Sequence, residues 1–251
     1  MGLFDLSGKT AVVTGAGRGL GEAIALGLAQ AGADIALVTN RTPADKAAEA
    51  IRALGRKAIT IQVDVADRSK LPGIVERTVD ELGRIDILVN NAGIIRRTPV
   101  ADHSYADWQD VLDVNLNSVF ALCQLAGNRM IEQGSGKIIN IASMLSFQGG
   151  INVPGYTSSK HAVAGLTKAL ASEWAAKGLQ VNAIAPGYMS TDNTEALRED
   201  PVRSAQILGR IPAGRWGTSE DLIGPAVFLA SAASDYMNGH ILAVDGGWLV
   251  R

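Results

Sequence analysis

A tyrosine and a lysine four residues apart are the clearest candidates for acid–base chemistry in this sequence. Tyr156 and Lys160 lie in a segment of helical character, and their spacing places both side chains on one helix face, one turn apart. A free tyrosine has a pKa of about 10, which is too high for an efficient base near neutral pH. Lowering it to about 7 takes roughly 4 kcal/mol of preference for the phenolate, which a nearby ammonium can supply in a partly desolvated site. A pair of this kind could therefore exchange a proton with a bound substrate.

Ser143 lies thirteen residues before Tyr156, at the end of an apolar β-rich run. Its hydroxyl is suited to polarise a substrate oxygen in the manner of an oxyanion hole. A serine in this position also commonly caps a helix, and a tyrosine–lysine pair at helical spacing is commonly a surface pair. The chemical interpretation therefore depends on which other motifs accompany these residues.

A glycine-rich loop with the sequence TGAGRGLG occupies residues 14–21. Glycine lets the backbone turn sharply and lets a pyrophosphate approach the main chain, while the following helix offers free N–H groups at its positive end. The order is glycine, three residues, glycine, one residue, glycine, so Leu20 occupies the last position of the common G-x-G-x-x-G pattern. With a strand before it and a helix after it, the loop predicts a dinucleotide site.

The elements that must position these residues alternate between short β-rich runs and longer helical runs. The predicted strands cover residues 10–14, 34–39, 58–63, 85–90, 137–142, 180–185 and 240–245, and the predicted helices cover 19–31, 44–54, 68–82, 106–132, 156–177 and 219–231. Most strands are apolar throughout, as in parallel sheets that are covered on both faces. We expect an α/β fold, a Rossmann-type, doubly wound, parallel seven-stranded sheet in a single domain spanning residues 1–251.

The least regular stretch covers residues 187–217, where glycines, prolines and polar residues interrupt a short helical pattern. An irregular insert after a late strand of a doubly wound sheet lies near the ligand-binding edge. We interpret this stretch as a mobile substrate flap, and the alternative is an ordinary surface excursion.

Composition narrows the classes of partner. Hydrophobic residues make up 47% of the chain, charged residues 19%, and the net charge is -2, so we expect neither nucleic acid nor a membrane as a main partner. No signal peptide or long apolar run is evident, and the one cysteine, Cys123, cannot form an internal disulfide, so we expect a cytoplasmic setting. The three histidines are widely separated, and no metal site is predicted.

Motifs along the whole chain resemble those of the short-chain dehydrogenase/reductase family. They are the glycine order after Thr14, Asp64 after the third strand, NNAG at 90–93, Pro186-Gly187 after the sixth strand, and the set Asn115, Ser143, Tyr156 and Lys160. The resemblance implies hydride transfer between a nicotinamide cofactor and a carbonyl/alcohol pair, with those four residues as the catalytic tetrad. It implies that Lys160 also contacts the cofactor ribose, that Asn115 holds a water linking Lys160 to solvent, and that the chain forms a homotetramer.

The cofactor-binding residues expected from this resemblance are Gly15, Arg18, Gly19, Leu20, Gly21, Asn40, Arg41, Asp64, Val65, Asn91, Ala92, Gly93, Tyr156, Lys160, Pro186 and Gly187. Enzymes that use NAD usually place an acid at the end of the second strand to hold the ribose hydroxyls. Here the strand ends in Thr39, followed by Asn40 and Arg41, and Arg18 and Arg41 could attract a 2′-phosphate. We favour NADP, and NAD stays open because some relatives in sugar-acid metabolism use it without this acid.

The segments around residues 94–97, 143–150, 211–217 and 244–248 resemble the branch of the family that acts on sugar acids of the deoxygluconate or gluconate type. A carboxylate substrate needs a cation, and Arg96 or its neighbour Arg97 offers a two-pronged match, with a surface salt bridge as the alternative. The predicted substrate contacts are Arg96, Ser143, Gln148, Tyr156, Tyr188 and Asn193. Two rival functions remain, a 3-oxoacyl carrier-protein reductase or other carbonyl reductase on the same fold, and a non-catalytic nucleotide-binding protein.

Overall fold

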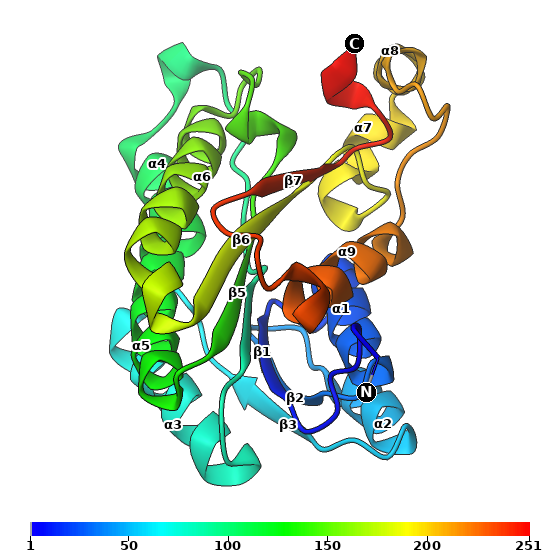
Figure 1. The fold of residues 1–251 in the computed structure, drawn as a ribbon. Helices are drawn as coiled ribbons and strands as arrows, with labels where there is room; N and C mark the ends of the chain where they lie inside the picture. Colours follow the sequence, from blue (N-terminus) through cyan, green and yellow to red (C-terminus); the bar gives the residue numbers. More distant parts are fainter. Residues whose placement is uncertain (1) are drawn as a thin grey trace.

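The computed structural model describes residues 2–251 as one α/β domain built on a parallel sheet (Figure 1). The sheet has seven strands in the order β3-β2-β1-β4-β5-β6-β7, and every neighbouring pair is parallel. Its strands are β1 (Thr10–Thr14), β2 (Asp34–Thr39), β3 (Ala58–Gln62), β4 (Ile87–Asn90), β5 (Gly136–Ile141), β6 (Leu179–Pro186) and β7 (Ile241–Val244). The predicted fold class is confirmed, and each predicted strand matches an observed one to within two residues at either end.

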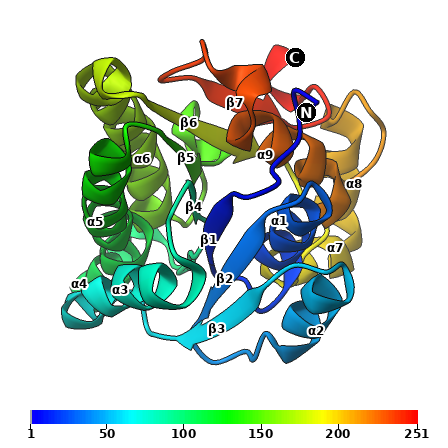
Figure 2. The same cartoon turned by 60° about the horizontal axis from the view of Figure 1, so that its bottom comes forward.

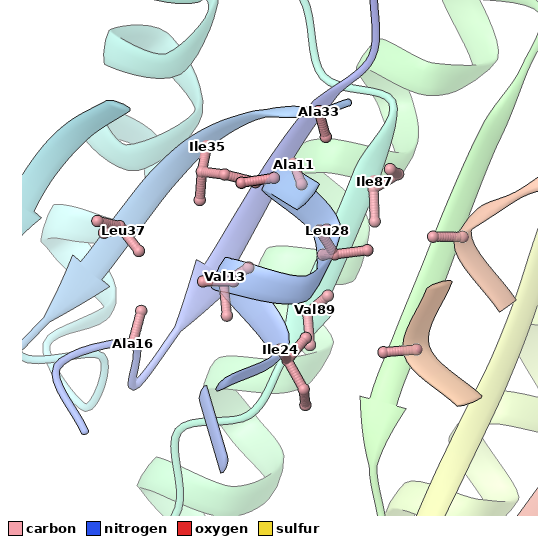
Figure 3. Packing of buried hydrophobic residues seen from close by; sticks show 14 of the residues in the cluster. Ala11, Val13, Ala16, Ile24, Leu28, Ala33, Ile35, Leu37, Ile87 and Val89 are labelled. Atoms are coloured by element: carbon pink, nitrogen blue, oxygen red, sulfur yellow. The ribbon is translucent and has the colours of Figure 1, made fainter. Parts of the chain in front are cut away.

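Helices cover both faces of the sheet (Figure 2). One layer contains α1 (Gly19–Gln30), α2 (Asp45–Ala53) and α9 (Ile223–Ala230), and the other contains α3 (Leu71–Leu82), α4 (Tyr105–Leu112), α5 (Ser118–Gln133) and α6 (Pro154–Trp174). Strand side chains alternate between these layers. Val12 packs with the layer of α3 and α5, whereas Ala11 and Val13 pack with Ile24 and Leu28 of α1 (Figure 3). Most strand residues are apolar because both faces of the sheet are covered.

The strand order reverses between β1 and β4. From β1 the chain proceeds to β2 and β3 on one side, and from β4 it proceeds to β5, β6 and β7 on the other. The loops that leave the carboxyl ends of β1 and β4 therefore diverge, which opens a crevice at that edge of the sheet. The glycine-rich loop follows β1 and the NNAG run begins at the last residue of β4, so both lie at this edge.

The long helix predicted over 106–132 contains an unpredicted wide turn. α4 continues into a π-helical turn, η3 (Asp113–Asn117), and then into α5. A π-helical turn accommodates one more residue than an α-helical turn does, and such turns are frequent at functional sites. Hydrophobic periodicity cannot reveal this turn, because the pattern on each side is that of an ordinary helix.

The segment 187–217, defined here as the flap, contains more regular structure than the sequence suggested. It holds η6 (Asp192–Thr194), α7 (Glu195–Glu199) and α8 (Pro201–Arg210). Its two ends are joined by a bridge between Met189 and Gly217 and by a 2.7 Å hydrogen bond from the Ser190 amide to the Gly217 carbonyl. Ile207 and Ile211 are buried against the core. Within residues 2–251, no helix is both long and apolar enough to cross a membrane.

Candidate active site

Ser143 and Tyr156 come together beside the carboxyl end of β5. Ser143 lies two residues beyond β5, where its side chain caps the short helix η4 (Met144–Ser146) by accepting a hydrogen bond from the Leu145 amide. Tyr156 lies in the first turn of α6, and the Ser143 side chain is close enough to its phenol to lower the pKa of the phenol. The helix cap that the sequence left open is therefore present on Ser143, and a substrate oxygen between these two hydroxyls would meet two donors.

Ser146, which the sequence analysis did not single out, links the Ser143 loop to α6. Its hydroxyl accepts a hydrogen bond from the Ser143 amide at 3.3 Å and donates one to the Lys160 carbonyl at 2.7 Å. Ser146 is 9% exposed, so neither bond competes strongly with water. The contact fixes the loop that carries Ser143 against the helix that carries Tyr156 and Lys160.

The pKa of Tyr156 differs in direction from the sequence-based expectation. Burial of the phenol raises its pKa above 10, and this effect outweighs the hydrogen bond from Ser143 and the positive charge of Arg97, which both lower it. Lys160 is not among the groups that shift it. The expected lowering toward neutral pH is therefore wrong for the protein without its ligands, because the desolvation of a buried phenol dominates.

Lys160 lies one turn below Tyr156, with its Nζ atom 5.5 Å from the centre of the phenol ring. The ammonium is buried at 4% residue exposure and donates a 2.5 Å hydrogen bond to the Ile141 carbonyl at the end of β5. Burial lowers the pKa of Lys160 to about 8. The residue therefore holds a cation beside the Tyr156 ring at neutral pH, and its contact with a cofactor ribose stays a prediction.

Asn115 occupies the centre of the π-helical turn and is fully buried. Its Oδ1 atom accepts the Ile94 amide at 2.8 Å, and its Nδ2 atom donates to the Ile94 carbonyl at 2.9 Å and to Ser159 Oγ at 3.3 Å. The wide turn thus aims an amide at the backbone that follows NNAG and at α6. The side chain positions these two segments, and its predicted role in holding a water stays a prediction.

The glycine-rich loop is fixed to the NNAG segment through Thr14. The Thr14 hydroxyl accepts the amides of Asn91 and Ala92 at 2.9 and 3.0 Å, and the Asn91 side chain donates to the Thr14 carbonyl at 2.9 Å. A Cβ atom on Gly21 would lie 2.3 Å from the Gly15 carbonyl oxygen, and Gly15 has a φ of +65°. Only glycine fits both positions, and the cradle that results is suited to a pyrophosphate at the start of α1.

Most of the other predicted cofactor residues line the same edge of the sheet. Gly93 faces Asn115, Gly19 has open space around its Cα, and Leu20 packs against the core as part of α1. Asn40 and Arg41 follow β2 and are exposed, whereas beyond β3 Asp64 is exposed and Val65 is buried. Pro186 ends β6, and a Cβ atom on Gly187 would lie 2.6 Å from the Asp245 Cα.

Arg18, at the start of α1, forms an ion pair with Asp192 of the flap, with 2.6 Å between Nη1 and Oδ2. The sequence analysis predicted Arg18 as a cofactor contact and did not identify Asp192. The two residues are 174 positions apart, so no local pattern could have indicated the pair.

The predicted substrate contact Arg96 pairs with carboxylates of α4. Its guanidinium pairs with Asp107 at 3.4 Å and with Asp110 at 3.3 Å, both on α4. The surface salt bridge that the sequence left open is thus the observed state of Arg96. Its neighbour Arg97 instead lies close enough to Tyr156 to lower the pKa of the phenol. Alternate residues of an extended loop point in opposite directions, which the sequence alone could not assign to one arginine or the other.

Gln148 and Tyr188 lie in the wall between the Ser143 loop, the flap and the C-terminal turn. Gln148 accepts a 3.4 Å hydrogen bond from Arg210 of α8, and the Arg210 guanidinium stacks 4.0 Å from the ring centre of Trp248. Tyr188 packs against Trp248, with ring centres 4.6 Å apart, and meets Trp216 edge-on at 5.6 Å. The predicted contact Asn193 has a side chain that lies outside the described part of the structure. Among the described residues, no group of three or more His, Cys, Asp or Glu side chains could hold a metal ion.

Comparison with known proteins agrees with the family resemblance of the motifs. Residues 9–202 match the protein family described as "short chain dehydrogenase". The 2-dehydro-3-deoxy-D-gluconate 5-dehydrogenase of Escherichia coli (strain K12) is 56% identical over 249 residues, which cover 99% of this chain and 98% of that protein.

Two solved structures share the whole architecture. One, described as a 2-deoxy-D-gluconate 3-dehydrogenase from Agrobacterium tumefaciens with bound NADP, is 54% identical, covers 100% of both chains and has a TM-score of 0.94. The other is a gluconate 5-dehydrogenase from Burkholderia cenocepacia in complex with NADP and tartrate, which is 42% identical over 99% of this chain and 98% of that one, with a TM-score of 0.95. The resemblance predicted from the motifs is confirmed.

Proposed function

The chain belongs to the short-chain dehydrogenase/reductase family of oxidoreductases, and on that premise we propose that it transfers a hydride between NADP and the secondary alcohol or ketone of a sugar acid of the deoxygluconate or gluconate type. The observation that carries this proposal is the meeting of Ser143, Tyr156 and Lys160 beside a glycine cradle at the point where the strand order reverses. The names of the relatives supply the substrate class.

The residues of the cradle fit a dinucleotide. Gly15 and Gly21 leave the space that a side chain would fill, Thr14 holds the loop rigid, and the N-terminus of α1 faces the loop. When bound, the nicotinamide supplies or accepts the hydride. NADP is favoured over NAD because β2 ends in Thr39 without an acid, because Arg18 and Arg41 lie near the ribose position, and because two relatives are crystallised with NADP.

In this proposal Tyr156 donates and accepts the proton. A raised pKa keeps the phenol protonated at neutral pH, so the residue is ready to donate a proton to the oxygen of a ketone as that oxygen gains charge. Ser143 donates a hydrogen bond to the same oxygen and stabilises its developing charge. For alcohol oxidation the phenol must lose its proton first, and the positive charge of Arg97 and the Ser143 hydroxyl favour the phenolate.

Arg97 is our candidate for the residue that binds the carboxylate of the substrate. A guanidinium matches a carboxylate with two parallel hydrogen bonds, and Arg97 lies on the Tyr156 side of the loop after NNAG. Gln148 is placed to contact a sugar hydroxyl. We infer that the flap closes over the bound substrate, since its base adjoins Gly187 and its helix α8 contacts Gln148.

The test is an assay of hydride transfer, followed by the absorbance of reduced nicotinamide, across deoxygluconate and gluconate derivatives and 3-oxoacyl thioesters. We expect turnover with the sugar acids, and loss of turnover with retained NADPH binding in Tyr156→Phe. Turnover with thioesters alone would replace this function by that of a 3-oxoacyl carrier-protein reductase. An unchanged biological activity in Tyr156→Phe would favour a non-catalytic nucleotide-binding protein.

We also propose that the chain assembles as a homotetramer, as members of this family commonly do. Exposed apolar side chains on and before α4 and α5 support an interface there, namely Val100, Tyr105 and Phe120. Light scattering of the purified protein tests this, and a monomeric mass would refute it. The cytoplasmic setting expected from the sequence stays a prediction.

A further inference from the structure

The ion pair between Arg18 and Asp192 joins the two sides of the cofactor crevice. Arg18 belongs to the glycine-rich loop after β1, and Asp192 is the first residue of η6, at the base of the flap. Their side chains are 65% and 66% exposed, so each could turn toward another partner without leaving a buried charge unpaired.

Asp192 is held in place by its own segment. The Thr191 and Thr194 side chains close a capping box around η6, and Arg198 donates a hydrogen bond to the Thr191 carbonyl. A hydrogen bond between the Ser190 amide and the Gly217 carbonyl ties the base of the flap together. The carboxylate is thus presented to the glycine-rich loop by a braced backbone.

Arg18 lies near the position that distinguishes NADP from NAD. A Cβ atom on Gly17 would lie 2.5 Å from the Thr42 carbonyl oxygen, so the tip of the glycine-rich loop touches the segment just after Arg41. Arg18 and Arg41 are therefore the sequence neighbours of the two residues in this contact, which lies just after the end of β2, where a 2′-phosphate would be bound. β2 contributes no acid of its own.

We propose that Asp192 is a specificity residue for the cofactor, because it competes with the 2′-phosphate of NADP for the Arg18 guanidinium. The proposal rests on the proposed use of a nicotinamide dinucleotide. A carboxylate that neutralises Arg18 weakens the attraction for a phosphate but has little effect on NAD, which offers only hydroxyl groups there. By reciprocity, NADP binding would release Asp192 and loosen the flap, whereas NAD binding would leave the pair intact.

The test measures dissociation constants of NADPH and NADH by fluorescence titration, at fixed ionic strength, for the unaltered protein and Asp192→Asn. Exposed ion pairs contribute up to about 1 kcal/mol, so we expect the NADPH dissociation constant to fall about three- to fivefold. The value for NADH should change by less than about 1.5-fold, because its ribose carries no competing anion. Glu199→Gln is the matched control, since it removes the same charge from an exposed site on α7, and it should change neither constant.

A double-mutant cycle with Arg18→Met separates the proposed competition from a general charge effect. In the Arg18→Met background, Asp192→Asn should no longer tighten NADPH. An unchanged or weaker NADPH affinity in Asp192→Asn, an equal gain for NADH, or a gain that persists without Arg18 would each overturn the proposal while leaving the proposed function intact. Failure of the unaltered protein to bind either dinucleotide would instead refute the proposed function, and this inference with it.

Discussion

The buried ammonium of Lys160 should make the protein less stable at neutral pH than a variant that lacks it. The pKa of Lys160 falls from 10.5 to about 8 on folding, because the side chain is buried. A difference of about 2.5 pKa units corresponds to roughly 3 kcal/mol against the folded state while the lysine is charged in both states. Lys160→Met keeps an unbranched side chain of similar length and removes the charge.

The sign of the pH dependence follows from proton binding. Between about pH 8 and 10.5 the folded protein has released the Lys160 proton while the unfolded chain still holds it, so stability rises with pH across that window. Lys160→Met has no such group. The free energy of unfolding of Lys160→Met should exceed that of the unaltered protein most below pH 8, and this difference should shrink by roughly 3 kcal/mol by pH 10.5.

Urea unfolding of both proteins at several pH values between 7 and 10.5 measures this difference, and groups that the two proteins share cancel. Loss of the hydrogen bond to the Ile141 carbonyl shifts the Lys160→Met curve by about 1 kcal/mol but does not depend on pH, because a neutral amine donates as well. A constant gap between the two curves would refute the reasoning. Lys160→Met should also lose most of the enzyme activity. Lys160 would then be a residue that lowers stability but is needed for function.

Three further predictions concern residues around the crevice. Arg97→Met should raise the KM for the sugar acid by about 10- to 100-fold with a smaller change in kcat, whereas Arg96→Met should change the KM little. Steady-state kinetics of the two variants measures this difference, and equal effects on KM would contradict the assignment of Arg97. Ser146→Ala should lower the free energy of unfolding by about 1 kcal/mol and reduce kcat more than it raises KM, and a variant with normal kcat would show that the Ser143 loop holds its position unaided. Gly21→Ala should weaken NADPH binding in a titration, because its Cβ would displace the Gly15 carbonyl, and unchanged affinity would show that the cradle adapts.

Much of the fold was predictable because strands that are buried on both faces have long apolar runs in the sequence. β1 and the part of β2 after Asp34 are of this kind, and the layers of α1 and α5 alternate with the strands as the doubly wound arrangement requires. The candidate catalytic residues could be singled out because their spacing is set by one helix turn and by the return from β5 to α6. The irregular segment 187–217 and a short helical pattern within it could be recognised, but the bounds of α7 and α8 could not, since short helices depend on packing more than on periodicity.

The features that escaped prediction depend on contacts between distant segments. Arg96 and Arg97 are adjacent and chemically identical, and only the position of the α4 carboxylates decides which one turns away from Tyr156. The Arg18–Asp192 pair joins residues that are 174 positions apart in the sequence. Whether the pKa of Tyr156 is raised or lowered depends on how completely the phenol is desolvated, and residue types and spacing do not specify this.

The wide turn at Asp113–Asn117 makes the number of residues in this helix as restrictive as their identity. α4 packs on α6, where Val111 and Trp108 lie against Gly155, while α5 packs on β4 and β5. The π-helical turn holds one residue more than an α-helical turn, so α4 and α5 keep their faces on α6 and the sheet while Asn115 is turned toward the Ile94 backbone. Deleting one residue from the turn would restore an ordinary α-helix with both faces still in place, but Asn115 would lose its hydrogen bonds to the Ile94 amide and carbonyl. Such a deletion should therefore disturb the segment after NNAG more than the packing of the helix.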